Sequence, residues 1–575
     1  MDDRKTFADA DHGSESPPPT SPYVATANSH RAAFASASIS WGLPFCPTLA
    51  NAPKATSGVQ ESIIDIGTLL PAHARYRADV PALRVSDCEL TFAALNRQVN
   101  RLANAWHAAG IAKGDKVATV MTNRLEFVLA YLAAAKTGVV IVPISPLLNE
   151  SGLQALLADS DTVLVIADAS FASALEGIRP DLPAIEPGRF VLAGADNPVE
   201  GFVAFDEFVR DASTDDPPDP KLVDDDVYNI MYSSGTTGLP KGIVHTHYVR
   251  SVYCTLFASS FRITPESVLL HAGSIVFNGA MMDLMPWLYL GCQYILHEAF
   301  DAKRMLDEIE VSQVTHVILV PSQVSALLNH PEFDAAKLSS LEMFTSVGAP
   351  LLLEYKNRIN DVLPGRFYEL YGLTEGFITI LDKTDAVRKT SSVGVPVKFS
   401  EMKILDTDGN EIRVGEIGEI CGRGPLMMKG YYNRPDLSAQ AVVDGWLHSG
   451  DMGYVDEDGF LYLVDRMKDM IISGGVNVYP KDIEEVIVAH PAVMEVAVFG
   501  IPDDKWGEVP IAAVTLLAGE KLAVNELIEW TNARVAAKYQ RVASGVILPK
   551  FPRNVAGKTL KREIRAQYLN RSRTP

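Results

Sequence analysis

The sequence predicts an α/β protein with a large N-terminal domain of parallel-rich sheets covered by helices, and a small mobile C-terminal α+β domain. Its 575 residues exceed what one hydrophobic core usually serves, so two or more domains are expected. From about residue 90 onward, segments with helical spacing alternate with short apolar runs, which is typical of parallel sheets. The alternation breaks at the charged turn "VDRMKDM", residues 464–470.

The elements follow from this alternation in order. Residues 91–110 carry apolar side chains at helical spacing and end on Gly110, a suitable helix cap. "KVATVM" then predicts a buried strand, "EFVLAYLAAAKTG" a helix and "VVIVPI" a second strand. The pattern returns as helix, strand and helix in "MLDEIEVSQVTHVILVPSQVSALLNH".

The ends of the predicted domains come from changes in composition. Residues 1–60 are rich in Ser, Ala and Pro and predict a disordered extension. A targeting peptide is the alternative, but this stretch has few Arg and no apolar core. We predict an N-terminal domain over residues 61–464, a hinge over 465–470 and a C-terminal lid over 471–575.

Charge and cysteine content exclude several classes of protein. The net charge is −20, from 51 basic and 71 acidic residues spread along the chain, which disfavours nucleic acid or an anionic membrane as partner. The five cysteines form no CxxC motif or Cys/His cluster in the sequence, so neither a disulfide framework nor a zinc site is indicated, and a reducing cytoplasm fits. Apolar runs are too short to cross a bilayer.

A loop rich in glycine and hydroxyl groups, "YSSGTTGLPKG", spans Tyr232 to Gly242. It is not a Walker A loop, because Lys241 is followed by Gly242 instead of Ser or Thr. Its glycines, hydroxyls and single lysine still suit the phosphate chain of a nucleotide. The alternative is an ordinary turn after the strand "VYNIMYS".

Four further motifs follow in order: "YGLTE" (371–375), "LHSGDMG" (447–453), "DRMKDMIISGGVNVYPKDIE" (465–484) and "PRNVAGKTLKREIR" (552–565). With the loop, they make the chain resemble the adenylate-forming enzymes: acyl-CoA synthetases, nonribosomal peptide adenylation domains and luciferases. The resemblance covers roughly residues 60–570. It implies that a carboxylate attacks the α-phosphorus of ATP, and that a thiol then displaces AMP from the acyl-adenylate.

The resemblance also implies which residues hold the nucleotide. Those implied for the β- and γ-phosphates are Ser233, Ser234, Gly235, Thr236, Thr237, Gly238 and Lys241. Those implied for the adenine side are Gly348, Ala349, Pro350, Tyr371, Gly372 and Thr374. Glu375 and Thr236 are implied as Mg²⁺ ligands, and Asp451 and Arg466 as ribose contacts. Taken alone, Glu375 also fits a helix N-terminal carboxylate, Tyr371 a core residue and Asp451 a turn.

The predicted catalytic lysine is Lys558, whose ammonium would stabilise charge between the carboxylate and the α-phosphate. By the resemblance, Lys468 is the pivot of the hinge and Gly475 borders the tunnel for the thiol. Lys468 also fits an ordinary exposed lysine. His245 and His247 of "HTH" lack a third ligand in the sequence and are interpreted as local packing.

The acyl pocket is expected in the segment "HAGSIVFNGAMMDL", residues 271–284, called the acyl wall below. The residues predicted to contact the acid are Phe277, Asn278, Gly279, Met281, Val347 and Ile378. Val276 and Phe277 depart from the family's aromatic-histidine gate. Relatives that activate amino acids have an aspartate where this chain has Asn278, so a buried ammonium would be unpaired. The sequence therefore favours a hydrophobic acid, either aliphatic or aromatic.

Three functions follow from this reading. The first is a ligase that joins the acid to coenzyme A with ATP and Mg²⁺, since no carrier domain follows Lys558. The second is a stand-alone enzyme that loads a carrier protein, and the third is a noncatalytic nucleotide-binding relative. The partners expected are small molecules and a second copy in a homodimer, without nucleic acid or integral membrane.

Overall fold

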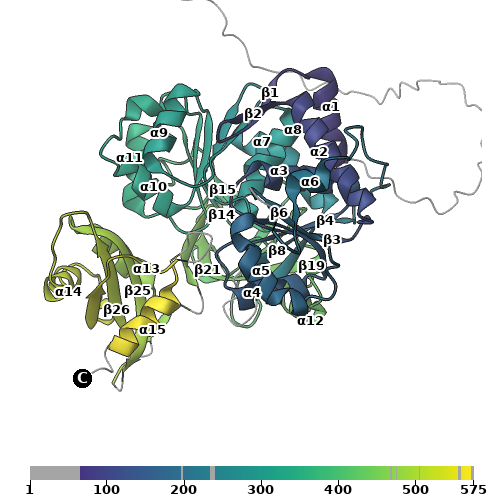
Figure 1. Ribbon diagram of the computed structural model, residues 1–575. Coiled ribbons are helices and arrows are strands. Elements are labelled where there is room, and N and C mark those ends of the chain that lie inside the picture. The colour runs from purple at the N-terminus through teal and green to yellow at the C-terminus, as the bar shows by residue number, and fades with distance from the viewer. Residues whose placement is uncertain are drawn as a thin grey trace, which may run out of the picture. The chain divides into compact units, whose positions relative to one another are not determined.

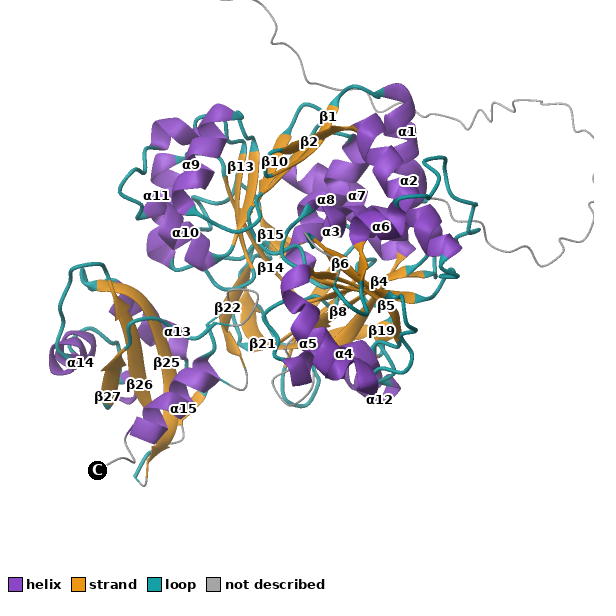
Figure 2. Cartoon of the chain, in the orientation of Figure 1, coloured by secondary structure: helices purple, strands orange, loops and turns teal. Residues whose placement is uncertain are grey.

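Apolar runs form the strands, and the segments between them form helices, as the alternation predicts (Figures 1 and 2). The structure, a computed structural model, describes residues 65–195, 199–233, 240–466, 469–473, 476–503, 505–553 and 559–571. Within these ranges the strands form four sheets.

The first sheet has eight strands among the described residues, in the order β19-β9-β8-β4-β3-β5-β6-β7. Its centre is parallel, and β8, β9 and β19 pair antiparallel at one edge. The bounds are β3 Lys116–Val120, β4 Val140–Ile144, β5 Thr162–Asp168, β6 Phe190–Ala193, β7 Val203–Ala204, β8 Val227–Ser233, β9 Lys241–Thr246 and β19 Gly430–Tyr431.

The second sheet has nine strands in the described ranges, in the order β16-β15-β14-β13-β12-β10-β11-β1-β2. The strands from β14 to β1 are parallel, and both ends are antiparallel. The bounds are β1 Pro81–Val85, β2 Cys88–Thr91, β10 Val268–His271, β11 Gln293–Leu296, β12 His316–Leu319, β13 Met343–Val347, β14 Phe367–Gly372, β15 Ile378–Leu381 and β16 Val395–Pro396.

Helices cover both faces of these two sheets. One cluster of buried side chains joins α1, α2, α3, α7 and α8 to strands of both sheets, so these helices form a shared layer. Helices α9, α10 and α11 pack on the other face of the nine-stranded sheet, and α4 and α5 on the other face of the eight-stranded sheet. The bounds are α1 Leu69–Tyr76, α2 Phe92–Ala108, α3 Leu125–Thr137, α4 Glu150–Asp159, α5 Ala172–Ile178, α6 Phe205–Val209, α7 His247–Phe261, α8 Met281–Leu290, α9 Ala302–Val311, α10 Pro321–Leu328 and α11 Leu353–Val362.

Local chemistry sets where the helices of the shared layer begin and end. The Thr91 hydroxyl accepts from the backbone N–H of Ala94 and caps α2, whose helical segment is followed by Gly110 at φ +75°. Helix α3 is apolar on all sides because it is buried on all sides, and it stops at Gly138, whose φ of +70° favours glycine. Thr246 caps α7 in the same way as Thr91 caps α2.

A third, antiparallel sheet precedes the hinge. In the described ranges it contains β17 Glu401–Leu405, β18 Gly418–Arg423, β20 Val442–Val443, β21 Trp446–Val455 and β22 Leu461–Arg466, with α12 Pro435–Ala441 beside it. Strand β22 runs directly into the predicted hinge. Residues 467–468 lie outside the described ranges, so the hinge and the domain bounds stay predictions.

The fourth sheet belongs to the C-terminal part of the chain and has helices on both faces. Helices α13 and α14 share one buried cluster with the sheet, and α15 joins a second cluster through Ile564. The bounds are β23 Ile471–Ser473, β24 Val476–Val478, β25 Val493–Asp503, β26 Gly507–Leu516, β27 Ser544–Ile547, α13 Pro480–Val488, α14 Val524–Asn532 and α15 Lys561–Arg571. This is the α+β arrangement that the sequence predicts.

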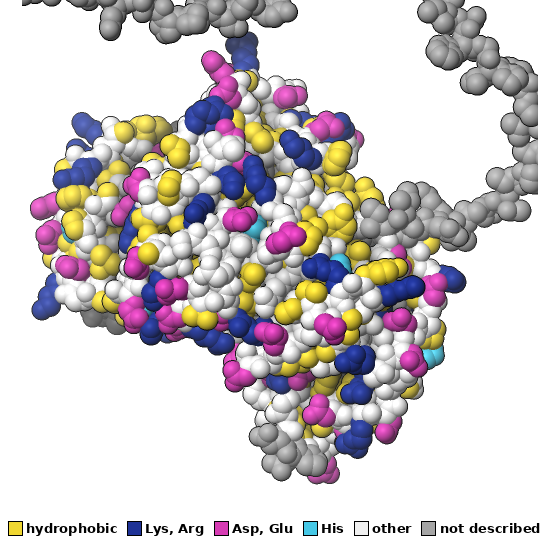
Figure 3. Space-filling view, turned by 90° about the horizontal axis from the view of Figure 1, so that it is seen from above, with side chains coloured by type: hydrophobic (Ala, Val, Ile, Leu, Met, Phe, Trp, Pro, Cys, Tyr) yellow, Lys and Arg dark blue, Asp and Glu magenta, His cyan; other side chains and the backbone are white. Residues whose placement is uncertain are grey.

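The surface is mixed in character. On the face drawn in Figure 3, acidic and basic side chains are interspersed with apolar ones. Within the described ranges, none of the helices combines the length and the apolar character that a membrane crossing requires.

Candidate active site

The predicted phosphate loop connects two paired strands. Strands β8 and β9 form an antiparallel pair in which Ser233 lies opposite Lys241. The structure therefore places the two ends of the loop side by side. The residues between them that were predicted to bind phosphate, Ser234, Gly235, Thr236, Thr237 and Gly238, lie outside the described ranges.

Tyr431 brings the phosphate lysine and the predicted Mg²⁺ ligand together. Its hydroxyl donates to Glu375 Oε1 at 2.8 Å, and Lys241 Nζ lies 4.6 Å from the centre of its ring. Burial, and then the Glu375 carboxylate, raise the pKa of the Tyr431 hydroxyl, so it keeps its proton and donates. Its position follows from β19, which pairs with β9 and puts Tyr431 opposite Ile243.

The predicted adenine and ribose residues also meet. The Tyr371 hydroxyl donates to Asp451 Oδ2 at 2.9 Å, although the two residues are 80 positions apart. Asp451 lies opposite Arg466 in the ladder between β21 and β22, and the side chain of Arg466 lies outside the description. The hydrogen bond thus connects the end of β14 to β21, the strand that pairs with β22.

The predicted adenine slot lies at the carboxyl ends of two parallel strands. Val347 at the end of β13 pairs with Leu370 of β14, so Gly348 follows beside Tyr371. Gly348 has φ +90°, a conformation that favours glycine. A Cβ on Gly372 would lie 2.7 Å from the carbonyl oxygen of Phe377, so only glycine fits there. Ligands of α/β proteins commonly bind at this edge of a parallel sheet.

Asp451 lies in β21, not in a turn, and Glu419 supports the irregular stretch of β21 that carries it. Its Oε1 accepts from the Gly450 N–H, and its Oε2 lies 2.9 Å from His448 Nδ1. Glu419, Cys421 and His448 offer three potential metal-ligand atoms within 4.8 Å of one another, because Cys421 and His448 are cross-strand neighbours. Both carboxylate oxygens already have partners, so we interpret this cluster as a support for the irregular part of β21.

Four of the predicted acyl residues lie in or against the main hydrophobic core of the large domain. Met281 and Ile378 are buried in the main core, and Phe277 and Val347 pack against the same core from partly buried positions. Asn278 begins a short 3₁₀ turn before α8. Its amide oxygen accepts from Arg250, and its amide nitrogen donates to the Tyr253 hydroxyl at 2.9 Å.

The acyl wall is held by polar side chains from outside it. The Asn123 amide nitrogen donates to the carbonyls of Gly273 and His297, at 2.6 and 2.9 Å, and its oxygen accepts from the Ile275 N–H. The Tyr131 hydroxyl donates to the Ile275 carbonyl at 2.8 Å. The conformation of this segment is thus specified by α3 and the loop before it, which the sequence reasoning did not identify.

The residues predicted for domain alternation lie outside the described ranges: Lys468, Gly475 and Lys558. The structure does describe both ends of the segment that carries Lys558. Arg553 and Thr559 form an isolated antiparallel bridge, and Arg553 pairs with Glu495 of β25. These contacts attach the base of the segment to the C-terminal sheet.

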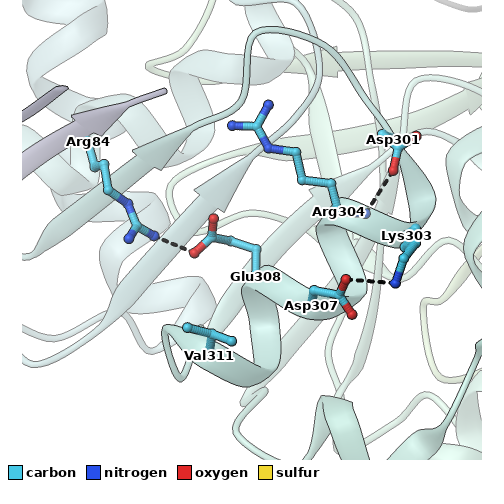
Figure 4. Close-up of a pocket in the computed structure, with 7 residues that line it drawn as sticks. All are labelled: Arg84, Asp301, Lys303, Arg304, Asp307, Glu308 and Val311. Carbon is cyan, nitrogen blue, oxygen red and sulfur yellow. Dashed lines mark hydrogen bonds and ion pairs between the residues drawn. The ribbon is translucent and has the colours of Figure 1, made fainter. Parts of the chain in front are cut away.

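A charged hollow near α9 is separate from these motifs (Figure 4). Arg84 pairs with Glu308, Lys303 lies 3.0 Å from Asp307, and Asp301 caps the helix at the Arg304 N–H. Arg84 and Lys303 are paired with acidic groups, and acidic residues line the hollow beside the basic ones, so it offers no concentrated positive charge for a polyanion. Its lining residues are Arg84, Asp301, Lys303, Arg304, Asp307, Glu308 and Val311.

Comparison with known families matches most of the chain. A family model described as AMP-binding enzyme matches residues 70–432. A second model, described as AMP-binding enzyme C-terminal domain, matches residues 482–558. The two matches lie on either side of the predicted hinge.

Individual relatives agree with these models. A feruloyl-CoA synthase from Amycolatopsis sp is 35% identical over 88% of this chain and 99% of its own length. A long-chain-fatty-acid–CoA ligase from Mycobacterium tuberculosis is 35% identical over 84% of this chain and 94% of its own. The solved o-succinylbenzoate CoA synthetase of Bacillus subtilis, bound to its acyl-adenylate, superposes with a TM-score of 0.76 at 30% identity, covering 86% of this chain and 97% of that one.

Proposed function

This chain belongs to the AMP-binding enzyme family, and from that premise we propose that it is an ATP-dependent acyl-CoA ligase for a hydrophobic carboxylic acid. The observation that carries the proposal is the contact of Tyr431 with both Glu375 and Lys241. It joins two motifs that the sequence links to one triphosphate.

The reaction has two halves. In the first, a carboxylate oxygen of the acid bonds to the α-phosphorus of ATP and pyrophosphate leaves. In the second, the sulfur of CoA bonds to the acyl carbon, its proton is lost, and AMP leaves. The first half brings an anion against a polyanion, so the site must neutralise charge and hold both reactants in line. Lys241 and Lys558 are the proposed cations for this task.

Glu375 fits a hard divalent cation. Its Oε1 is oriented by the Tyr431 hydroxyl, and carboxylate oxygens are the ligands Mg²⁺ prefers. We propose that Glu375, with Thr236, holds Mg²⁺. When bound, Mg²⁺ would shield the charge of the phosphates.

The proposed acid class rests on apolar and neutral side chains. Met281 and Ile378 lie in the main core, and Phe277 and Val347 pack against it, so all four have apolar surroundings. Asn278 is neutral and already bonded on both sides, so it offers no anion to a substrate ammonium. These features support an aliphatic or aromatic acid, as do relatives named for ferulate and long-chain fatty acids.

The test is AMP release with MgATP across aliphatic, aromatic and amino acids, each with and without CoA. We expect CoA-dependent AMP release with a hydrophobic acid and none with amino acids. Adenylation that CoA cannot discharge would favour the carrier-loading alternative. Binding of ATP without AMP release from any acid of the panel would support the noncatalytic alternative.

The cytoplasmic location and the homodimer stay predictions from the sequence. Cys88, Cys254, Cys292 and Cys421 are free thiols in the described ranges.

A further inference from the structure

Helix α7 carries a guanidinium that is fully buried. Arg250 has 0% of its surface exposed, and its donors reach three separate segments. Its Nε donates to Asn229 Oδ1 at 2.8 Å in β8, and its Nη1 to Asn278 Oδ1 at 2.8 Å in the acyl wall. Its Nη2 donates to His245 Nδ1 at 3.1 Å in β9, and the Tyr253 ring lies 4.8 Å away.

This cation has no carboxylate among the acceptors that the described residues supply. Burying an ion costs several kcal/mol, and neutral acceptors offset only part of that cost. An apolar side chain of similar volume would serve packing alone at least as well. The buried guanidinium is therefore better explained by a role in fixing the positions of the segments that it contacts.

Its contact with His245 fixes the state of that imidazole. Arginine has donors only, so His245 Nδ1 must accept, and the Asn229 amide nitrogen approaches the same atom at 3.1 Å. The proton therefore sits on Nε2, which donates to the carbonyl of Thr374 at 2.8 Å. Burial, and then the Arg250 charge, hold the pKa of His245 well below its usual value, in agreement with a neutral ring.

The other end of this chain of bonds is the predicted metal ligand. Thr374 directly precedes Glu375, whose carboxylate is held by Tyr431. The backbone carbonyl of Glu375 also accepts from the Met428 N–H at 2.9 Å. A continuous path thus runs from Asn278 through Arg250 and His245 to the Thr374–Glu375 pair.

We infer that Arg250 and His245 are positioning residues that hold the acyl wall in register with the segment that carries Glu375. The inference rests on the proposed function, because it places the acid at Asn278 and MgATP at Glu375. The relative position of the acyl wall and the Glu375 segment matters because a shift of about 1 Å between two reactants lowers the reaction rate by roughly 10²-fold. The charge of Arg250 behind Asn278 also repels a substrate ammonium, which reinforces the exclusion of amino acids.

Two substitutions of one residue break the path at different bonds. In His245→Asn, the amide oxygen takes the place of Nδ1, so the bond from Arg250 is kept and the bond to Thr374 is lost. In His245→Gln, the amide nitrogen takes the place of Nε2, so the bond to Thr374 is kept and the bond from Arg250 is lost. A milder variant, Arg250→Lys, keeps the charge but cannot reach all three acceptors.

The first readout is calorimetric binding of MgATP, which needs no knowledge of the acid. We expect the Kd to rise about tenfold in His245→Asn and less in His245→Gln and Arg250→Lys, since only the first loses the bond to Thr374. The second readout is steady-state kinetics with an acid that the wild type accepts. We expect the KM of the acid to rise most in His245→Gln and Arg250→Lys, while the KM of CoA stays within about twofold.

The matched control is His316→Gln. His316 is also buried, 1% exposed, and its Nε2 lies 3.1 Å from the Phe261 carbonyl. It begins β12 and pairs with the first residue of β13, whereas Gly348 and Tyr371 lie at the other, carboxyl ends of the strands. We expect it to lower thermal stability without moving the Kd of MgATP or the KM of the acid.

The inference is overturned if the His245 and Arg250 variants lose stability as His316→Gln does yet bind MgATP with unchanged Kd. Failure of the proposed function looks different, because then the wild type itself releases no AMP with any acid. In that case the calorimetric comparison still decides whether His245 positions the nucleotide segment.

Discussion

At the scale of single residues, the site depends on side chains that belong to no recognised motif. Tyr431 is the main example, since it contacts Glu375 through its hydroxyl and Lys241 through its ring. The adjacent Tyr432 has the same chemistry but donates to Asp161 at 2.7 Å, away from the predicted motifs. The two tyrosines thus form a natural pair for experiment.

Tyr431→Phe should weaken Mg²⁺ activation. Loss of a hydroxyl that orients a metal ligand typically lowers metal affinity roughly 10- to 100-fold. The measurement is the Mg²⁺ concentration that gives half-maximal AMP release at fixed ATP. Tyr432→Phe should leave that concentration unchanged, and an equal shift in both variants would contradict the role given to Tyr431.

The contributions of the ring and the hydroxyl of Tyr371 can be measured separately. Tyr371→Phe keeps the ring and loses the bond to Asp451, whereas Tyr371→Ala loses both. If the ring stacks on adenine, the alanine variant should raise the KM of ATP by on the order of tenfold beyond the phenylalanine variant. Equal KM values in the two variants would show that only the hydroxyl matters.

At the scale of elements, the acyl wall is a loop whose shape is imposed by a neighbouring helix. Asn123 lies just before the start of α3 and is 3% exposed. Its side chain makes three hydrogen bonds to backbone groups, two of which belong to the acyl wall. Buried carbonyls and N–H groups that lose such partners are costly, because water does not replace them. The wall is therefore expected to be stiff.

Asn123→Ala should lower the free energy of unfolding by about 2–3 kcal/mol and raise the KM of the acid. Urea unfolding and the kinetics of AMP release measure the two effects. Asn104→Ala is the control, since Asn104 also donates to two carbonyls, those of Ser213 and Asp215, but at an exposed site in α2. It should cost less than about 1 kcal/mol and leave the KM of the acid unchanged.

At the scale of the whole molecule, buried neutral histidines make stability depend on pH. Burial lowers the pKa of both His247 and His316 from 6.5 to about 4, and burial together with the Arg250 charge holds the pKa of His245 well below its usual value. Below about pH 6.5 the unfolded chain binds protons that the folded chain does not, so stability is full above that pH and falls toward pH 4.

The expected slope is up to about 1.4 kcal/mol per pH unit for each such histidine. Urea unfolding at pH 7.5, 6 and 5 measures it. His316→Gln should show a shallower slope than the wild type, and parallel slopes would contradict the neutral state of His316.

The predicted roles of Lys558 in adenylation and of Lys468 in thioester formation can be tested separately. Lys558→Ala should abolish formation of the acyl-adenylate but spare thioester formation from supplied acyl-adenylate, because the charge of Lys558 is needed only in the first half. Lys468→Pro should do the reverse, because it restricts the predicted pivot. Single-turnover assays of each half separate the two, and equal loss of both halves in either variant would contradict the assignment.

The sequence by itself determined the fold class, the motifs and the family. Periodicity and short motifs are local properties, so "VVIVPI" predicted β4 and "YGLTE" was recognisable without coordinates. Ser233, Lys241, Glu375, Tyr371 and Asp451 were named from such motifs. The structure places Ser233 opposite Lys241, joins Tyr371 to Asp451, and brings Tyr431 into contact with both Lys241 and Glu375.

Only the tertiary structure decided which side chains hold those motifs in place. Tyr431 meets Glu375 across 56 positions, and His245 meets Thr374 across 129. The sequence predicted that Asn278 contacts the acid, but its amide oxygen accepts from Arg250 and its amide nitrogen donates to the Tyr253 hydroxyl. Such pairs depend on strand order and register, and a shift of one residue along a strand would turn each side chain to the opposite face. No local pattern encodes that information, because it resides in the packing of the whole domain.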